Sequence, residues 1–242
     1  DLHNQQAFST TPNDPYGRLR LEMKPHTNNP FVLHWHSGSV SNSLAIHGTL
    51  TNSDVADNKW HHYAVSLVQT ASAMRVRFYR DGEMVSDQTD SSNVINNIEG
   101  ISGGLNATIG GLIADPDGNA NLTIGDGKLS GSLDEFRYWK KERTARQIGL
   151  NWFKQVGGGT DDYTYNVDLG VYFKFNEGIV GTASTDSTVL DYSGRLSNGS
   201  WTGYTAGARL TSSAIVLSGK ATKEYKDPII YSTHPDVSSS LA

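Results

Sequence analysis

Short runs in which hydrophobic and polar residues alternate recur along the first two thirds of the chain. In residues 19–24, Leu and Met alternate with Arg, Glu and Lys, which is the period of a strand buried on one side. Strands are expected at residues 19–24, 31–36, 43–49, 61–69, 74–80 and 106–113, with turns at 37–41 and at Asp81-Gly82, and a loop over 86–104. The pattern therefore predicts hairpins of antiparallel strands.

The stretch of residues 127–159 predicts one more strand followed by a helix. A glycine-rich turn opens it, and residues 133–139 then place large apolar and aromatic side chains on a short run. Thr144 is expected to cap a helix over residues 145–156. Three consecutive glycines, residues 157–159, end that helix. We expect no other substantial helix.

Composition narrows the classes of partner. The 242 residues carry a formal net charge of −5 and no run of Lys or Arg, which argues against a nucleic-acid partner. No apolar run approaches the roughly 18 residues of a membrane span, so we expect no membrane insertion. There is no cysteine, which leaves the redox compartment open. Because the chain starts at Asp1 without a leader pattern, it is expected to be a processed product or a fragment.

Three blocks carry a more specific signal. They read NKWHHYAVSLVQTASAMRVRFYRDGEMV (58–85), NATIGGL (106–112) and GKLSGSLDEFRYWKKERTARQI (127–148). In this order they resemble the laminin-G-like branch of the concanavalin A-like jelly rolls. The resemblance implies an all-β, two-sheet antiparallel jelly-roll sandwich with one short helix. It also implies large buried aromatic residues at Trp60, Phe78, Phe136 and Trp139.

A motif that opens this family's domains occurs late in the chain. Residues 171–178 (VYFKFNEG) and 191–199 (DYSGRLSNG) resemble the family's first strand and the turn after it. Either they begin a second domain, or they fold back and complete the first. We favour the second interpretation, because too few residues follow for another jelly roll. The expected organisation is an N-terminal arm (1–16), a laminin-G-like jelly roll (17–218, with 17–157 as the main part and 166–218 completing it) and a C-terminal tail or linker (219–242).

Paired carboxylates are the first catalytic pattern to consider, because many jelly rolls of this kind are glycosidases. A retaining glycosidase needs two carboxyl groups about 5 Å apart on one face of a cleft. Asp134 and Glu135 are adjacent on the expected strand, so they point to opposite faces. The paired-carboxylate motif is therefore missing, so we expect no enzyme, and a glycoside hydrolase or lyase is only the alternative function.

Two groups of residues suggest metal binding from their side chains alone. His34, His36 and His47 would provide three imidazoles for Zn²⁺ if the hairpin brought them together, but histidines on a polar sheet face are the favoured interpretation. The loop 115–126 is rich in Asp and Asn, which suits Ca²⁺, yet it lacks the order of an EF-hand. Ordinary Asx turns are favoured there.

The resemblance itself implies a structural Ca²⁺ between the opening and closing strands. The matching residues here are Glu177, Asp191 and Asp134. The chain departs from the family at Asn176, where relatives often carry Asp, and in the permuted order of the blocks. Calcium is therefore the expected cofactor, if there is one.

A non-catalytic adhesion or structural module of a larger surface or virion protein is the expected function. Its expected partners are a glycan or cell-surface polysaccharide and neighbouring domains or subunits, at an extracellular or virion-surface location. Residues 157–199 also resemble tail-associated structural proteins of marine bacteriophages. A cellular receptor ectodomain is less expected, because the chain has no cysteine. For a sugar site, exposed rings that stack on pyranose faces are expected at Tyr16, Trp35 and Tyr204.

Overall fold

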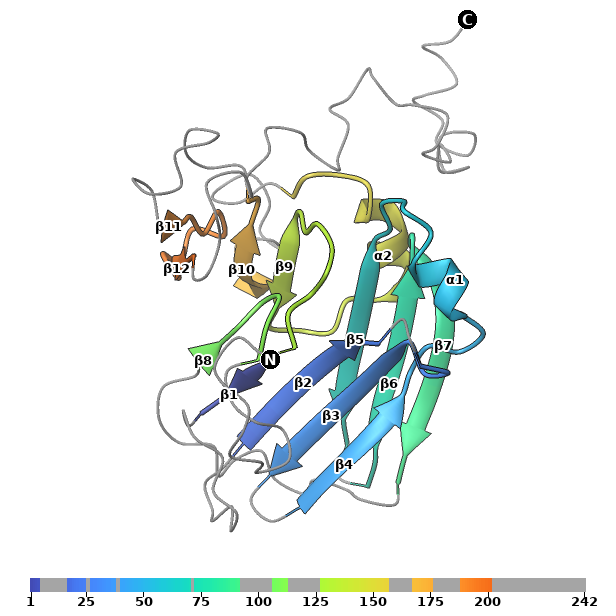
Figure 1. The fold of residues 1–242 in the computed structure, drawn as a ribbon. Helices are drawn as coiled ribbons and strands as arrows, with labels where there is room; N and C mark the ends of the chain where they lie inside the picture. The colour runs from blue at the N-terminus through green and yellow to red at the C-terminus, as the bar shows by residue number, and fades with distance from the viewer. Residues whose placement is uncertain are drawn as a thin grey trace, which may run out of the picture. The chain divides into compact units, whose positions relative to one another are not determined.

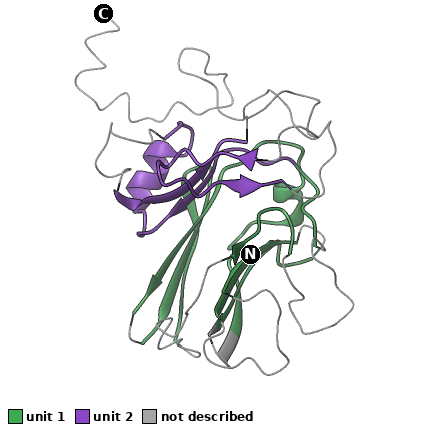
Figure 2. Cartoon of the chain, turned by 90° about the vertical axis from the view of Figure 1, so that its left-hand side faces the viewer, with its two compact units in different colours: residues 1–131 green, residues 132–242 purple. Residues whose placement is uncertain are grey.

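The structure is a computed structural model of residues 1–242, and its strands and helices are labelled in Figure 1. It describes residues 1–4, 17–24, 27–37, 40–70, 72–91, 106–112, 127–156, 167–175 and 188–201. The chain divides into two compact units, Asp1–Gly131 and Ser132–Ala242 (Figure 2). In the described ranges, no helix has both the length and the apolar character that crossing a membrane requires.

Unit 1 consists of two antiparallel sheets that form separate layers (Figure 1). The five-stranded sheet has the order β4 (Val40–Ala45), β3 (Phe31–Ser37), β2 (Gly17–Met23), β1 (Leu2–His3) and β8 (Asn106–Ala107). The three-stranded sheet has the order β5 (Tyr63–Gln69), β6 (Met74–Arg80) and β7 (Glu83–Asp90). The alternating run at residues 19–24 is thus a strand, as predicted.

The core of unit 1 lies between these two sheets. Buried side chains come from β3 and from β6, and Phe78 is 0% exposed. Phe31 of β3 packs against Phe78 and against Tyr63 of β5, with both ring centroids 4.7 Å away. Aromatic rings at such distances add to the free energy gained from burial alone. The two-sheet antiparallel sandwich predicted from the sequence is confirmed.

Hairpin turns fix the register of the strands. Asp81 and Gly82, the only residues between β6 and β7, have φ angles of 51° and 83°, as the predicted two-residue turn requires. The turn between β3 and β4 is tighter than expected, because Ser37 already pairs with Val40. The prediction of a loop from residue 86 was wrong: β7 continues to Asp90, since pairing with β6 outweighs its polar composition.

Unit 2 contains the pairing predicted between the late motif and the closing strand. β9 (Phe136–Trp139) pairs antiparallel with β10 (Leu169–Phe173), and Phe173 lies opposite Phe136. The short strands β11 (Thr188–Val189) and β12 (Gly199–Ser200) also pair. That residues 166–218 complete the sandwich of unit 1 stays a prediction.

The helix α2 (Ala145–Asn151) begins at the predicted cap. The Thr144 hydroxyl accepts a hydrogen bond from the Gln147 backbone N–H (3.2 Å), and the Gln147 side chain accepts one from the Thr144 backbone N–H (3.0 Å). This reciprocal pair satisfies two N–H groups that no helical carbonyl reaches. α2 ends five residues earlier than expected, with Trp152 at its C-cap. A one-turn helix, α1 (Asn52–Val55), was not predicted.

Two of the four aromatic residues expected in the core are exposed. Trp60 is 54% exposed and Phe136 is 36% exposed, so these two predictions were wrong. Trp60 precedes the first residue of β5 and therefore lies outside the strand ladder. Phe136 lies on β9 of a two-stranded sheet, whose other face carries the buried cluster with Tyr172. Phe78 is buried as predicted, and Trp139 is partly buried.

The face of the five-stranded sheet opposite to the core carries ion pairs. Glu22 on β2 contacts Arg20 and Lys24, and its carboxylate lies 3.2 Å from the Nε2 atom of His34 on β3. Burial favours the neutral acid, but the hydrogen bonds from His34 and Lys24 and the charge of Arg20 outweigh it and lower the pKa of Glu22 from 4.5 to about 2.

We predict that Phe78→Ala lowers the free energy of unfolding by about 3–5 kcal/mol, because it leaves a cavity between the sheets. Trp60→Ala is expected to lower it by about 1 kcal/mol or less, because more than half of that side chain is already in water. Urea unfolding followed by circular dichroism measures both values. Equal losses for the two variants would contradict the burial described here.

We also predict that Glu22 makes stability depend on pH in the acid range. Its folded-state pKa lies below its unfolded value, so its contribution is complete above pH 4.5 and disappears as the pH falls toward about 2. The difference in unfolding free energy between wild type and Glu22→Gln should therefore shrink over that interval. Glu83→Gln, at an exposed carboxyl of β7, is the matched control. A wild-type-to-Glu22→Gln difference that does not change with pH would contradict the prediction.

Candidate functional site

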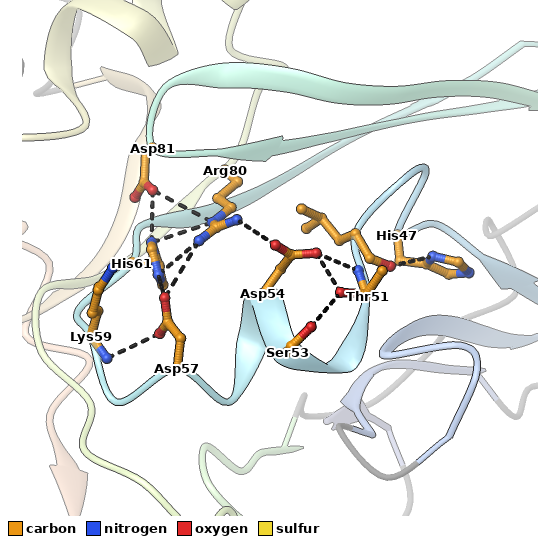
Figure 3. Close-up of polar contacts among 10 residues, drawn as sticks. His47, Thr51, Ser53, Asp54, Asp57, Lys59, His61, Arg80 and Asp81 are labelled. Atoms are coloured by element: carbon orange, nitrogen blue, oxygen red, sulfur yellow. Dashed lines mark hydrogen bonds and ion pairs between the residues drawn. The ribbon is translucent and has the colours of Figure 1, made fainter.

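The connection from β4 to β5 and the turn from β6 to β7 bring together a cluster of charged side chains in unit 1. Figure 3 shows Arg80 among carboxylates that come from both segments. Its guanidinium lies 3.9 Å from Asp54, 3.8 Å from Asp57 and 3.6 Å from Asp81. Arg80 is the last residue of β6, so the core strand places the charge at this end of the sheet.

His61 is held by carboxylates on both sides of its ring. Its Nδ1 atom lies 2.7 Å from Asp81, and its Nε2 atom lies 2.9 Å from Asp57. Arg80 also contacts both ring nitrogens, at 3.3 and 2.8 Å. The hydrogen bond from His61 lowers the pKa of Asp57, against the opposing effect of burial. The imidazole is therefore fixed in position and orientation (Figure 3).

Asp81 connects the hairpin turn to the chain that enters β5. One carboxylate oxygen accepts a hydrogen bond from the backbone N–H of His62 (2.8 Å), and the Asp81 backbone N–H donates to the His62 carbonyl (2.8 Å). The same carboxylate bonds His61. Because Asp81 also adopts the left-handed conformation of the turn, one residue fixes the turn and the segment before β5.

The short helix α1 is closed at its start by a carboxylate. The Asp54 side chain accepts hydrogen bonds from the backbone N–H (2.8 Å) and the hydroxyl (2.6 Å) of Thr51. The Thr51 hydroxyl contact lowers the pKa of Asp54. A shallow pocket of about 310 Å³ adjoins Thr51 and is lined by Asn28, His47, Gly48, Thr49, Leu50, Thr51 and Asn52.

Trp60 lies inside this segment, between Lys59 and His61. Residues on both sides of it are hydrogen-bonded, since Asp57 accepts a bond from the Lys59 backbone N–H (3.0 Å) and holds the ring of His61. The Trp-His-His-Tyr run at residues 60–63 resembles a strand start and on that basis predicts a core tryptophan. In the structure β5 begins only at Tyr63, so Trp60 lies before the strand. The sequence did not indicate this later start of β5.

The predicted sugar platforms are not borne out where the structure tests them. Trp35 is only 2% exposed and packs in the core between the sheets, so its prediction as an exposed platform was wrong. The physical reason is the alternation on β3, which places Trp35 on the same face as Phe31 and Leu33. Tyr16 and Tyr204 lie outside the described residues.

The predicted calcium ligands are only partly described. The buried carboxylate of Asp191 accepts hydrogen bonds from the backbone N–H groups of Tyr172 (2.9 Å), Ser193 (2.9 Å) and Ser197 (3.0 Å) and from the Ser193 hydroxyl (2.8 Å). Asp134 accepts one from the Glu135 backbone N–H (2.9 Å). Glu177 lies outside the described residues. Calcium binding by these three residues stays a prediction.

Two of the three histidines considered for zinc, His34 and His47, contact different groups. His34 pairs with Glu22, whereas His47 follows the end of β4 and contacts the Leu50 carbonyl (3.1 Å) and Asn29 (3.2 Å). Across the ranges listed above, no three His, Asp or Glu side chains gather closely enough to hold a metal ion. The favoured interpretation, histidines on a polar face, agrees with these contacts.

Glu135 in unit 2 is a buried carboxylate whose role the sequence did not indicate. It accepts a hydrogen bond from the Tyr172 hydroxyl, pairs with Arg137 (3.2 Å) and accepts another bond from Gln155 (3.2 Å). Burial and the Glu135 contact raise the pKa of Tyr172. The backbone of Glu135 has a φ of 55°, so this carboxylate also stabilises an unfavourable bend.

Comparison with known proteins gives one family and one structural likeness. Residues 2–149 match a laminin-G family model described as the concanavalin A-like lectin/glucanases superfamily. The chain is also similar to a crystal structure of an S-layer domain-containing protein (residues 221–444) from Clostridium thermocellum, with 19% identity and a TM-score of 0.29. That match covers 59% of this chain and 58% of the other, so it spans just over half of that protein's chain. The search of curated proteins found no match.

We predict that Asp81→Ala lowers the free energy of unfolding by about 2 kcal/mol, because it removes two hydrogen bonds and leaves Ala in a left-handed conformation. Asp81→Asn is the matched control. Asn tolerates the same backbone conformation and can still accept a bond from His62, so its loss is expected to be about half as large or less. Urea unfolding measures both. A larger loss for Asn than for Ala would contradict this role of the side chain.

Proposed function

Because the chain belongs to the concanavalin A-like lectin/glucanases superfamily, we propose that it is a non-catalytic recognition module of a larger surface or virion protein. In this role it contacts glycans and adheres to a cell surface or polysaccharide. The superfamily name includes both lectins and glucanases, and family membership alone therefore does not separate binding from hydrolysis. The directions in which the pKa values of the described carboxyl groups are shifted support binding rather than hydrolysis.

Every described carboxyl group with a shifted pKa is shifted downward. These groups are Glu22, Asp54, Asp57, Asp87 and Asp191. Burial opposes the shift in each, and hydrogen bonds outweigh it. A glycosidase instead requires one carboxyl group whose raised pKa keeps it protonated, so that it can act as the acid. Among the described residues, this direction supports binding rather than glycoside hydrolysis.

The contacts of Asp57, Asp81 and Glu135 also support binding rather than hydrolysis. Asp57 and Asp81 lie on the two sides of the His61 ring, and each is bonded to it. Glu135 is likewise enclosed by Tyr172 and Arg137. Carboxylates that are already bonded to protein donors stabilise the fold and hold neighbouring side chains in place. An origin in a bacteriophage tail and a structural Ca²⁺ stay predictions.

We predict that the chain is retained on a glycan array and releases no reducing sugar from any glycan that it binds. Array binding followed by a reducing-end assay on the bound glycans measures both. Release of sugar, or of an unsaturated product at 235 nm, would favour the enzyme instead. Heat-denatured protein is the control for nonspecific retention. Failure to bind any arrayed glycan would contradict glycan recognition.

A further inference from the structure

The indole of Trp60 is both exposed and unbound. More than half of its surface is in water, and no hydrogen bond, ion pair or ring contact connects it to another described residue. An indole provides a large apolar face and a single N–H donor. Leaving the apolar face in water is unfavourable for the free protein. Both the face and the donor are therefore available to a ligand.

The backbone on each side of Trp60 is fixed before any ligand arrives. The Lys59 N–H is bonded to Asp57, and the His61 ring is held between Asp57 and Asp81 (Figure 3). The His62 N–H is bonded to Asp81. Asn58 adopts a left-handed conformation (φ 60°) that Asn tolerates well. A ring on a fixed backbone loses little conformational entropy when it is covered.

The surroundings of Trp60 fit a sugar better than a protein surface. Trp60 is the one exposed large hydrophobic side chain of the described residues 47–62, and one more, Met84, lies on β7 just after the turn that follows β6. A protein interface has an apolar core of several neighbouring side chains, whereas one pyranose needs a single ring for its C–H face. Sugar hydroxyls can donate to the carboxylates of Asp57 and Asp81, whose oxygens accept more than one hydrogen bond.

Charge selects among glycans. The cluster holds three carboxylates, Asp54, Asp57 and Asp81, and two permanently basic side chains, Lys59 and Arg80, so the acidic groups outnumber these two cations. The whole chain carries −5. A polymer of uronic acids or sulfated sugars is negatively charged, and neither the cluster nor the chain as a whole offers an excess of positive charge to attract it. The cluster therefore favours an uncharged glycan.

We propose that Trp60 is the stacking platform of a binding subsite for neutral pyranose polysaccharides, with Asp57, Asp81 and the exposed Lys59 as hydrogen-bonding groups. The inference rests on the proposed function and adds to it the site and the class of ligand. It requires no chemistry at the sugar, only contact of the ring with one pyranose face.

Affinity electrophoresis of the whole chain tests this inference. The probes are the neutral polymers hydroxyethylcellulose, galactomannan and xylan, and the acidic polymers alginate and polygalacturonate. The variants are Trp60→Ala, Trp60→Tyr and, as matched control, Tyr138→Ala at another exposed aromatic residue. Wild type and Tyr138→Ala should be retarded by at least one neutral polymer. Trp60→Ala should bind about tenfold or more weakly, which corresponds to losing about 1.4 kcal/mol, and Trp60→Tyr should lie between them.

The other outcomes overturn the inference in distinguishable ways. If Trp60→Ala binds a neutral polymer as wild type does, the site is wrong and the proposed function stands. If wild type binds only the acidic polymers, the ligand class is wrong. If wild type binds none of the polymers and no glycan on the array, both proposals are wrong. If Trp60→Ala instead changes the sedimentation coefficient at unaltered melting temperature, the ring serves contact between copies of the chain.

Discussion

The packing of Phe31 against Tyr63 and Phe78 is the contact on which unit 1 depends, because it holds one sheet against the other. Two sheets that each expose an apolar face gain stability only by covering one another. Once this core is closed, β5 and β6 are fixed in register as far as the pair Tyr63 and Arg80. The candidate site begins at the end of the β5–β6 ladder, where Tyr63 pairs with Arg80.

The polar cluster extends this constraint beyond the core. Arg80 is the last residue of a core strand, and Asp81 is the first residue of its turn, so neither can move without moving β6. Through Asp81 and Asp57 the cluster then holds the segment that contains Trp60. The segment that carries the exposed indole is thus connected to the sandwich by hydrogen bonds of its neighbouring residues, whereas Phe78 is held in the sandwich by burial. A recognition surface needs this combination of exposure and fixed position.

Carboxylates stabilise the local structure in both units. In unit 1 they hold His61 and Arg80, and in unit 2 Asp191 closes a turn by accepting four hydrogen bonds from neighbouring protein groups. Such bonds stabilise the ionised form and make it a poor proton donor.

The sequence by itself determined features that depend on near neighbours. The alternation of apolar and polar residues predicted β2, the Asp81-Gly82 dipeptide predicted the turn between β6 and β7, and Thr144 predicted the start of α2. Each of these features depends on residues only a few positions apart. Only the tertiary structure decided which aromatic rings are covered. Trp35 and Trp60 both adjoin histidines in sequence, yet one faces the second sheet and the other precedes its strand. Burial depends on what packs opposite a residue, and that partner comes from distant parts of the chain.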